Sequence, residues 1–266
     1  MDMESSCKDK PQPNSFYTAA EKYWDNVPAT LDGILGGFGF ISQTDISGSD
    51  SFLSGLFQLD DPPGKTCALD CGAGIGRVTK NLLVKWFKQV DLVEQNKKFI
   101  DTAKSGLSSY SNKIGQFYNT GLQNFCPEPK KYDVIWCQWV LGHLEDEDLI
   151  QFLKNCSLGL NESGILIIKE NVTSSDESDI DSLDSSVTRS LKSLKYLCAE
   201  AGLICVRLEQ QHNMPAGLYR VYMMALRPDI KSRENASNVY FLFHKKLSVT
   251  DSPLSFFFTG LIPIAA

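Results

Sequence analysis

The chain of 266 residues carries 26 Lys and Arg against 32 Asp and Glu, a formal net charge of −6, and 42% of its residues are hydrophobic. This length and composition can bury one substantial core, so we expect one large domain. Nucleic-acid binders usually carry a basic surplus or a basic stripe, and the sequence has neither. A small molecule or a basic partner is therefore expected, without direct nucleic-acid binding.

The eight cysteines lie mostly in apolar runs, with no CxxC pair and no histidine at zinc-ligand spacing. They are interpreted as reduced core residues, and no metal site is predicted. Residues 1–15 are polar and lack the apolar core of a secretory signal, and no apolar run is long enough to span a membrane. We interpret residues 1–15 as a mobile tail and place the protein inside the cell.

Apolar residues at helical spacing predict a first helix over residues 16–27, which ends before Pro28. A glycine-rich turn over residues 31–39 follows. Strand-like runs then alternate with helix-length segments. The expected strand and helix pairs are 67–70 with 76–87, 90–94 with 96–107, 132–138 with 147–158, and 165–169 with 186–201. This alternation is typical of an open, mostly parallel α/β sheet.

Two further runs, 203–208 and 219–226, are separated only by a loop and predict a final antiparallel pair. A Rossmann-like sheet ending in such a hairpin resembles the class I methyltransferases, whose sheet is seven-stranded and mostly parallel. The expected domain spans residues 16–228 and includes an N-terminal helical extension. Residues 229–266 break the pattern, and their apolar end is too short to cross a membrane, so we interpret them as a poorly ordered C-terminal tail.

The loop LDCGAGIGR, residues 69–77, follows the first predicted strand and indicates a ligand at a helix N-terminus. The dinucleotide fingerprint GxGxxG would require a third glycine where Arg77 stands. A leading acid followed by GxGxG instead suits S-adenosylmethionine, which has no phosphate and whose carboxylate Arg77 is able to pair. Glu94, at the end of the next strand, is placed to accept the ribose hydroxyls. A dinucleotide and a purely structural turn remain as alternatives.

Two later segments agree with such a cofactor. Residues 120–125 lie where these folds present a backbone amide and a polar side chain to adenine, and the strand 132–138 ends over the cofactor. That strand continues into QWVLGH, residues 138–143, and not into the Asn-Pro-Pro-Tyr type of motif found in methyltransferases of DNA bases. From these residues alone, the simpler interpretation is a core Trp139 and a helix-start His143.

Five segments together resemble the eukaryotic α-N-terminal protein methyltransferases, the Xaa-Pro-Lys family. They are LDGILGGFG (31–39), LDCGAGIGR (69–77), GLQNFCPEP (121–129), YDVIWCQWVLGHL (132–144) and LDSSVTRS (183–190). The resemblance covers roughly residues 16–228. It implies that the enzyme uses S-adenosylmethionine to methylate the free α-amino group of proteins with an exposed N-terminal Xaa-Pro-Lys or Xaa-Pro-Arg motif. The expected compartments are the nucleus and the cytoplasm.

The resemblance also implies a role for individual residues. The cofactor residues would be Gly72, Arg77, Glu94, Leu122, Gln123 and Gln138, with Glu94 standing where relatives often have Asp. The substrate channel would include Trp24, Leu35, Gly36, Trp139, Asn171, Asp181, Asp184, Leu218 and Tyr219. Asp184 would hold and deprotonate the amine, with His143 beside it, and Asp181 would meet the substrate lysine.

The properties of these residues fit that substrate. An α-amine has a pKa of about 7.7–8, so roughly a fifth to a third is neutral at cellular pH and a weak base is enough to deprotonate it. A second-position proline favours an extended chain, which suits an aromatic channel. The segment SSDESDIDSLDSS, residues 174–186, supplies acid for a third-position lysine. An acidic, serine-rich run by itself is typical of a solvated loop or a kinase target.

Three other functions stay open at this point. The same cofactor loop would serve a small-molecule methyltransferase or a lysine methyltransferase, and a methyltransferase fold also occurs in inactive partner proteins. The sequence favours an active enzyme, because the glycine loop, Gln138, His143 and Asp184 are all present. It leaves the oligomeric state open.

Overall fold

The computed structural model describes residues 15–229, and every structural statement below refers to them. The expected tails therefore lie outside the described residues, apart from Ser15, which already begins a helix, and Asp229. In the described range no helix is long and apolar enough to cross a membrane.

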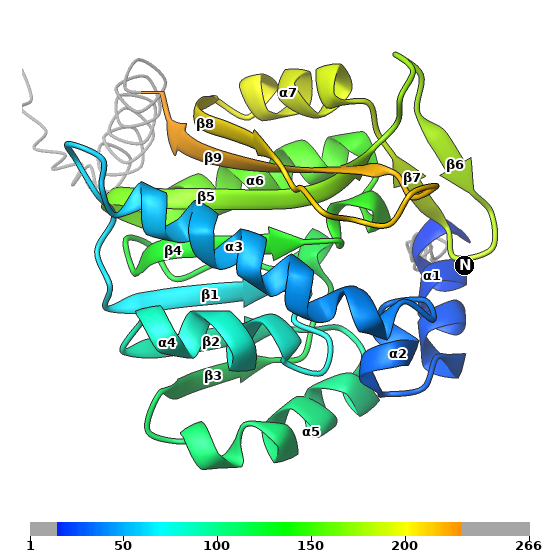
Figure 1. Ribbon diagram of the computed structural model, residues 1–266, viewed down its shortest axis with the longest axis horizontal. Coiled ribbons are helices and arrows are strands. Elements are labelled where there is room, and N and C mark those ends of the chain that lie inside the picture. The colour runs from blue at the N-terminus through cyan, green and yellow to red at the C-terminus, as the bar shows by residue number, and fades with distance from the viewer. Residues whose placement is uncertain (1–14, 230–266) are drawn as a thin grey trace, which may run out of the picture. The chain divides into compact units, whose positions relative to one another are not determined.

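Seven strands form one sheet in the order β3-β2-β1-β4-β5-β9-β8 (Figure 1). They are β1 (Cys67–Cys71), β2 (Gln89–Val93), β3 (Ile114–Tyr118), β4 (Tyr132–Gln138), β5 (Leu160–Val172), β8 (Leu203–Gln210) and β9 (Arg220–Pro228). The pairs among β1 to β5 are parallel, and β9 runs antiparallel to β5. The predicted seven-stranded, mostly parallel sheet is confirmed.

Helices cover both faces of this sheet. The α-helices of the described range are α1 (Ser15–Asn26), α2 (Leu31–Ile34), α3 (Ser42–Leu56), α4 (Val84–Trp86), α5 (Lys97–Gly106), α6 (Asp146–Gly159) and α7 (Leu191–Glu200). The buried residues of α6 and α7 form one apolar cluster with the sheet, and those of α3 and α4 form another. Figure 1 shows α3 crossing the front of the sheet, with α6 and α7 behind and above.

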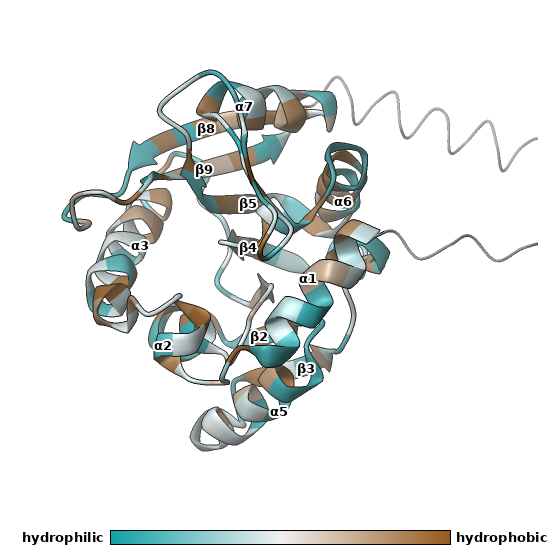
Figure 2. Cartoon of the chain, turned by 90° about the vertical axis from the view of Figure 1, so that its right-hand side faces the viewer, coloured by the Kyte–Doolittle hydropathy of each residue, from teal (hydrophilic) through white to brown (hydrophobic). Residues whose placement is uncertain are grey.

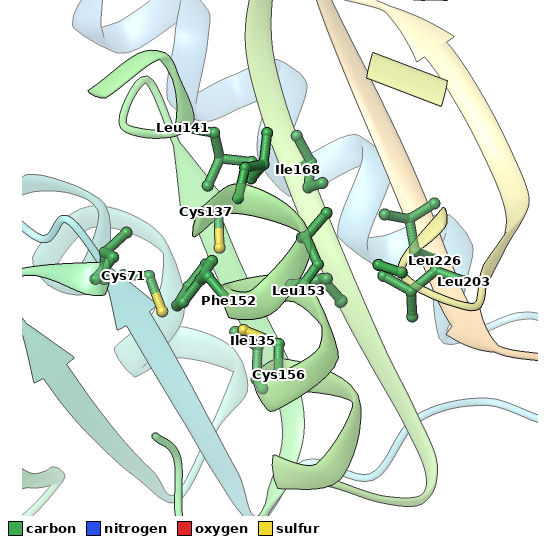
Figure 3. Packing of buried hydrophobic residues seen from close by; sticks show 14 of the residues in the cluster. Cys71, Ile135, Cys137, Leu141, Phe152, Leu153, Cys156, Ile168, Leu203 and Leu226 are labelled. Carbon is green, nitrogen blue, oxygen red and sulfur yellow. The ribbon is translucent and has the colours of Figure 1, made fainter. Parts of the chain in front are cut away.

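The neighbouring strands β1 and β4 are buried along their whole length, because helices cover both of their faces. Figure 3 shows the cluster on the α6 side, where Phe152 and Leu153 pack against Ile135 and Cys137 of β4. Burial of large apolar side chains on both faces holds the strands rigidly. Their carboxyl ends are therefore a firm platform for a site.

Several element boundaries differ from the sequence predictions. The helix predicted over 186–201 begins only at Leu191, where the Ser190 side chain accepts a hydrogen bond from the Ser193 N–H at 3.1 Å. Residues ahead of it form β7 (Ser186–Thr188), which pairs with β6 (Asp179–Asp181) in a separate two-stranded sheet. The acidic segment thus belongs to a hairpin whose first strand is exposed and whose second is half-buried, and it is not a plain loop.

Other differences have local causes. The helix predicted over 76–87 is a π-helix over Thr79–Leu83 followed by the short α4. The glycine-rich turn contains α2, which the Thr30 side chain caps by accepting from the Gly33 N–H. The helix α3 was not predicted, because serine and glycine interrupt its apolar pattern. The strand β3 was not predicted either, because it is only partly buried.

The cysteines agree with the prediction in part. Five of those described, Cys67, Cys71, Cys137, Cys156 and Cys198, are buried free thiols. Cys126 and Cys205 are exposed, so the interpretation of all cysteines as core residues was wrong for these two. Cys7 lies outside the described residues.

Candidate active site

Two pockets adjoin at the carboxyl ends of β1, β2 and β4, with α1 and α2 at the same end (Figure 2). One, the glycine-loop pocket, is lined by residues 72–74, Arg77, Glu94, residues 120–123 and Gln138 among others. The other, the hairpin pocket, is lined by Glu170, Asn171, Asp184, residues 186–188 and Tyr219 among others. Both share Trp24, Ile34, Leu35, Trp139 and His143, so a ligand in one would face a ligand in the other.

The glycine loop takes a backbone path that other residues rarely adopt. Gly72, Gly74 and Gly76 have φ angles of +68°, +55° and +79°. A Cβ atom on Gly72 would also lie 2.4 Å from Val140 Cγ2, so the loop has no room there for a side chain. The sequence GxGxG is therefore required by the shape of the loop.

Glu94 follows directly after β2 and fixes the loop from the other side. Its two carboxylate oxygens accept hydrogen bonds from the Gly74 N–H at 2.8 Å and the Asn96 N–H at 2.7 Å. Burial raises the pKa of Glu94, while these backbone donors favour its charged form. Each carboxylate oxygen can accept a second bond, so the group is suited to bind a vicinal diol.

Arg77 lines the same pocket with a nearly buried guanidinium. Its Nη1 donates to Asp45 Oδ2 at 2.6 Å, and the group lies 5.5 Å from the centre of the Trp139 ring. Gln138 Nε2 donates to the same carboxylate at 2.8 and 2.9 Å. Asp45 belongs to α3 and is fully buried, and sequence reasoning missed it, because no motif around it signals a site.

All six predicted cofactor residues line the glycine-loop pocket, namely Gly72, Arg77, Glu94, Leu122, Gln123 and Gln138. This donor set fits S-adenosylmethionine: Glu94 suits the ribose, Arg77 suits the carboxylate, and residues 120–123 offer a polar edge for adenine. A dinucleotide fits less well, because Arg77 stands in place of the third glycine next to the pyrophosphate position.

Seven of the nine predicted substrate residues line the hairpin pocket. They are Trp24, Leu35, Trp139, Asn171, Asp184, Leu218 and Tyr219. Gly36 lies next to Leu35 at a φ of +58° and is not part of the lining. Asp181 is also outside the lining, exposed on β6, where its Oδ1 accepts from the Leu183 N–H at 2.8 Å.

His143 and Asp184 meet in the hairpin pocket with unpaired atoms. Trp24 Nε1 donates to His143 Nε2 at 3.1 Å, whereas His143 Nδ1 and Asp184 Oδ1 are buried and have no hydrogen-bond partner among the described residues. Burial lowers the pKa of His143, and the charge of Asp184 opposes this shift. Because Nε2 accepts from Trp24, the neutral form of the histidine carries its proton on Nδ1.

Glu170 is a further acid of the hairpin pocket that sequence reasoning missed. It follows Lys169 near the end of β5, and its Oε1 accepts from the Val140 N–H at 2.8 Å and the Leu141 N–H at 2.9 Å. These bonds hold the turn at Trp139, a non-glycine residue with a φ of +52°. Trp139 of this turn is part of the wall that both pockets share.

The fold and the pocket together define a class I, S-adenosylmethionine-dependent methyltransferase. Residues 12–227 match the family model described as AdoMet-dependent proline di-methyltransferase. The chain therefore belongs to that family.

Relatives and a solved structure agree with this assignment. The chain is 49% identical over 214 residues to the N-terminal Xaa-Pro-Lys N-methyltransferase 1 of Xenopus tropicalis, which covers 80% of this chain and 95% of the relative. It is 50% identical over 218 residues to the alpha N-terminal protein methyltransferase 1 of Drosophila melanogaster, over 81% of this chain and 77% of the relative. A SAM-dependent methyltransferase from Leishmania major superimposes with a TM-score of 0.75 at 38% identity, over 80% of this chain and 83% of that one.

Proposed function

We propose that this enzyme methylates the free α-amino group of proteins whose N-terminus begins Xaa-Pro-Lys or Xaa-Pro-Arg. The observation that carries the proposal is the adjacency of the two pockets, with the unpaired Asp184 Oδ1 and His143 Nδ1 in the hairpin pocket beside the shared wall. The names of the relatives support the substrate motif.

In the proposed reaction this chain removes one proton from the substrate α-ammonium group and aligns its nitrogen with the methyl group. S-adenosylmethionine supplies the methyl group, and the attacking amine must be neutral and in line with it. Asp184 Oδ1 has no partner of its own and is available to hold the ammonium and accept its proton. The Trp24 hydrogen bond occupies His143 Nε2, so the histidine acts through its Nδ1–H, which is able to donate to Asp184 and orient it.

The rest of the pocket suits the next two substrate residues. Trp24, Trp139 and Tyr219 line it with aromatic rings, against which a proline packs without an unpaired N–H. Beyond Tyr219 the hairpin carries Asp179, which accepts a hydrogen bond from Tyr219 Oη at 2.9 Å, and the exposed Asp181. We propose that Asp181 meets the lysine or arginine at the third position, since its side chain is exposed beside the pocket rim.

Incubation of an unblocked Ser-Pro-Lys or Pro-Pro-Lys peptide with S-adenosylmethionine, followed by tandem mass spectrometry, tests the proposal. Methyl groups are expected on the α-nitrogen, with no reaction of the N-acetylated peptide. A Lys-to-Glu change at position three is expected to weaken binding sharply, because it places like charges together. Methylation of internal lysines, or turnover only with a metabolite panel, would contradict the assignment.

The proposed compartments are the nucleus and the cytoplasm. The five buried free thiols fit a reducing compartment, where cysteines stay reduced. Imaging of the tagged full chain checks this.

A further inference from the structure

A buried ionic network lies directly behind the glycine-loop pocket. The carboxylate of Asp45 in α3 accepts hydrogen bonds from Arg77 Nη1 at 2.6 Å and from Gln138 Nε2 at 2.8 Å. Both of these donors line the pocket. On the other side, Lys169 Nζ of β5 lies 2.6 Å from Asp45 Oδ1 and donates to the backbone oxygen of Asp45 at 2.9 Å. Asp45 thus connects Lys169 to two pocket residues.

Lys169 has no access to solvent and is held in place on all sides. Its side chain is 0% exposed, and Nζ also donates to Ser49 Oγ and Gln211 Oε1, each at 2.8 Å. Burial lowers the pKa of Lys169 to about 8, while the charge of Asp45 opposes this shift. Burial disfavours the charge on Asp45 too, but Lys169 and Arg77 together lower its pKa. The contact with Asp45 therefore favours the charged form of Lys169, and Lys169 and Arg77 favour the charged form of Asp45.

The charge balance of this network has a consequence for ligand binding. Asp45 alone would neutralise Arg77, since the two form a close pair of opposite charges. Lys169 supplies the second positive charge, so the trio carries a net charge of +1 in a buried region where charges interact strongly. The trio lies beside Asp70, whose pKa burial raises to about 6 and whose charged form Arg77 favours. This net charge faces the pocket through Arg77, because Lys169 lines neither pocket.

We propose that Lys169 and Asp45 are positioning residues for the amino-acid end of the cofactor. Asp45 orients the guanidinium of Arg77 and the amide of Gln138, and Lys169 offsets the charge of Asp45 so that Arg77 keeps its attraction for a carboxylate. The inference rests on the proposed placement of the cofactor carboxylate at Arg77. It adds that the selectivity for a carboxylate is set by two residues that do not touch the cofactor.

The test compares two ligands that differ only in the carboxylate, S-adenosylhomocysteine and its decarboxylated analogue, by calorimetric titration. In Lys169→Met, the affinity for S-adenosylhomocysteine is expected to fall by about tenfold or more, because Asp45 then cancels Arg77. The analogue, which has no carboxylate for Arg77 to bind, is expected to lose at most about threefold. Equal losses for both ligands would overturn the inference, since they would indicate a purely structural role.

A charge-balanced double variant tests whether the loss of affinity comes from the charge or from destabilisation of the fold by an unpaired buried charge. Asp45→Asn with Lys169→Met restores a single positive charge without an unpaired buried charge, and it is expected to recover most of the lost preference. Lys169→Arg keeps the charge and is expected to keep the preference. A double variant that discriminates as poorly as Lys169→Met, or a loss of preference in Lys169→Arg, would contradict the proposal.

Two controls separate this inference from the placement on which it rests. Lys131→Met removes the partner of another buried acid, Asp91, at a site that lines neither pocket, and the preference is expected to stay unchanged. Arg77→Leu is expected to abolish the preference. An Arg77→Leu variant that still prefers the carboxylate would overturn both the placement and the inference. If Arg77→Leu abolishes the preference for the carboxylate but Lys169→Met keeps it in full, the inference is wrong and the placement of the cofactor stands.

Discussion

Asp184 and His143 each bring one buried, unpaired atom to the hairpin pocket. A buried polar atom without a partner costs about 1–3 kcal/mol, so such atoms persist where a ligand will satisfy them. A substrate ammonium brings N–H donors for Asp184 Oδ1. The residue that best distinguishes chemistry from binding is therefore Asp184.

We expect Asp184→Asn to bind S-adenosylmethionine nearly as tightly as the unchanged enzyme and to lose at least about tenfold in turnover. Asparagine keeps the size of the side chain but cannot accept the proton, and loss of a general base costs about 100- to 10,000-fold. Raising the pH should restore part of the rate, because more of the substrate amine is then neutral without help. Turnover of an unblocked peptide between pH 7 and 9, with calorimetry of the cofactor, measures both effects.

Asp181→Asn, at an exposed position of β6, serves as the matched control, because it changes the same type of side chain three residues before Asp184. It is expected to weaken peptide binding without changing the pH dependence of turnover. Wild-type turnover of Asp184→Asn at neutral pH would rule out this residue as the base.

Glu170 links the protonation of one side chain to the stability of the fold. Burial raises its pKa to about 7 from a usual 4.5, although the Leu141 and Val140 N–H groups favour the charged form. The folded state therefore binds this proton more tightly than the unfolded state does. The stability that this group contributes is fully present below pH 4.5 and is lost as the pH rises to 7.

Glu170→Gln removes this titration while keeping an oxygen acceptor for the two N–H groups. The stability of the variant relative to the unchanged protein should rise by up to about 3 kcal/mol between pH 4.5 and pH 8. Urea unfolding across this range measures the difference. The exposed Glu162→Gln on β5 is the control, and an identical pH dependence of Glu170→Gln and the unchanged protein would contradict the expectation.

Among the elements, α1 carries Trp24 to both pockets and is attached to the domain near its two ends. Near its start, Tyr17 Oη donates to Asp148 of α6, and the Glu145 N–H donates to the same hydroxyl at 3.3 Å. At its end, Asn96 Nδ2 donates to Asp25 Oδ1 at 2.9 Å and Lys98 Nζ donates to the backbone oxygen of Asp25 at 2.8 Å. With only Ala20 buried, these bonds matter for the position of the helix.

Tyr17→Phe should loosen the start of α1 without unfolding the sheet. A hydrogen bond to a charged group contributes about 1.5–3 kcal/mol, so amide exchange in residues 15–22 is expected to speed up about tenfold or more. The KM for the peptide should rise, because Trp24 and its bond to His143 move with the helix. Hydrogen exchange read by mass spectrometry checks this, with Tyr196→Phe, an exposed tyrosine of α7, as the control. Unchanged exchange in α1 would mean that Tyr17 does not hold it.

The parallel strands and their helices were predictable, because each buried strand is a short apolar run followed by a helical period. The hairpin β6–β7 was not predictable, since its strands have only three residues each and neither of them is buried. The helix α7 was predicted too long for the same reason, because the residues before Ser190 pair with β6 rather than continue the helix. Pairing within this hairpin overrode the helical pattern of residues 186–190.

For the whole molecule, deletion of residues 229–266 should leave peptide methylation and the melting temperature unchanged. The seven strands end at Pro228, the family match ends at residue 227, and both pockets are lined by residues before 222. The shortened chain thus keeps every group that the proposed reaction uses. A methylation assay and thermal unfolding of the truncated protein test this, and a soluble but inactive truncation would show that the removed segment takes part in the reaction.

The sequence by itself determined the class of enzyme, because the glycine loop, Arg77 and Glu94 lie within one stretch whose spacing already limits the ligand. Its resemblance to a family also predicted six cofactor residues, and all six line one pocket. Asp45, Lys169 and Glu170 were decided only by the tertiary structure. They come from α3 and β5, outside the segment of the loop, and their roles arise from distances of less than 3 Å to side chains or backbone groups that no local pattern connects to them. Buried charges act on whatever lies beside them in space, and only the packing of α3 against the sheet brings Asp45 next to Lys169 behind the glycine-loop pocket.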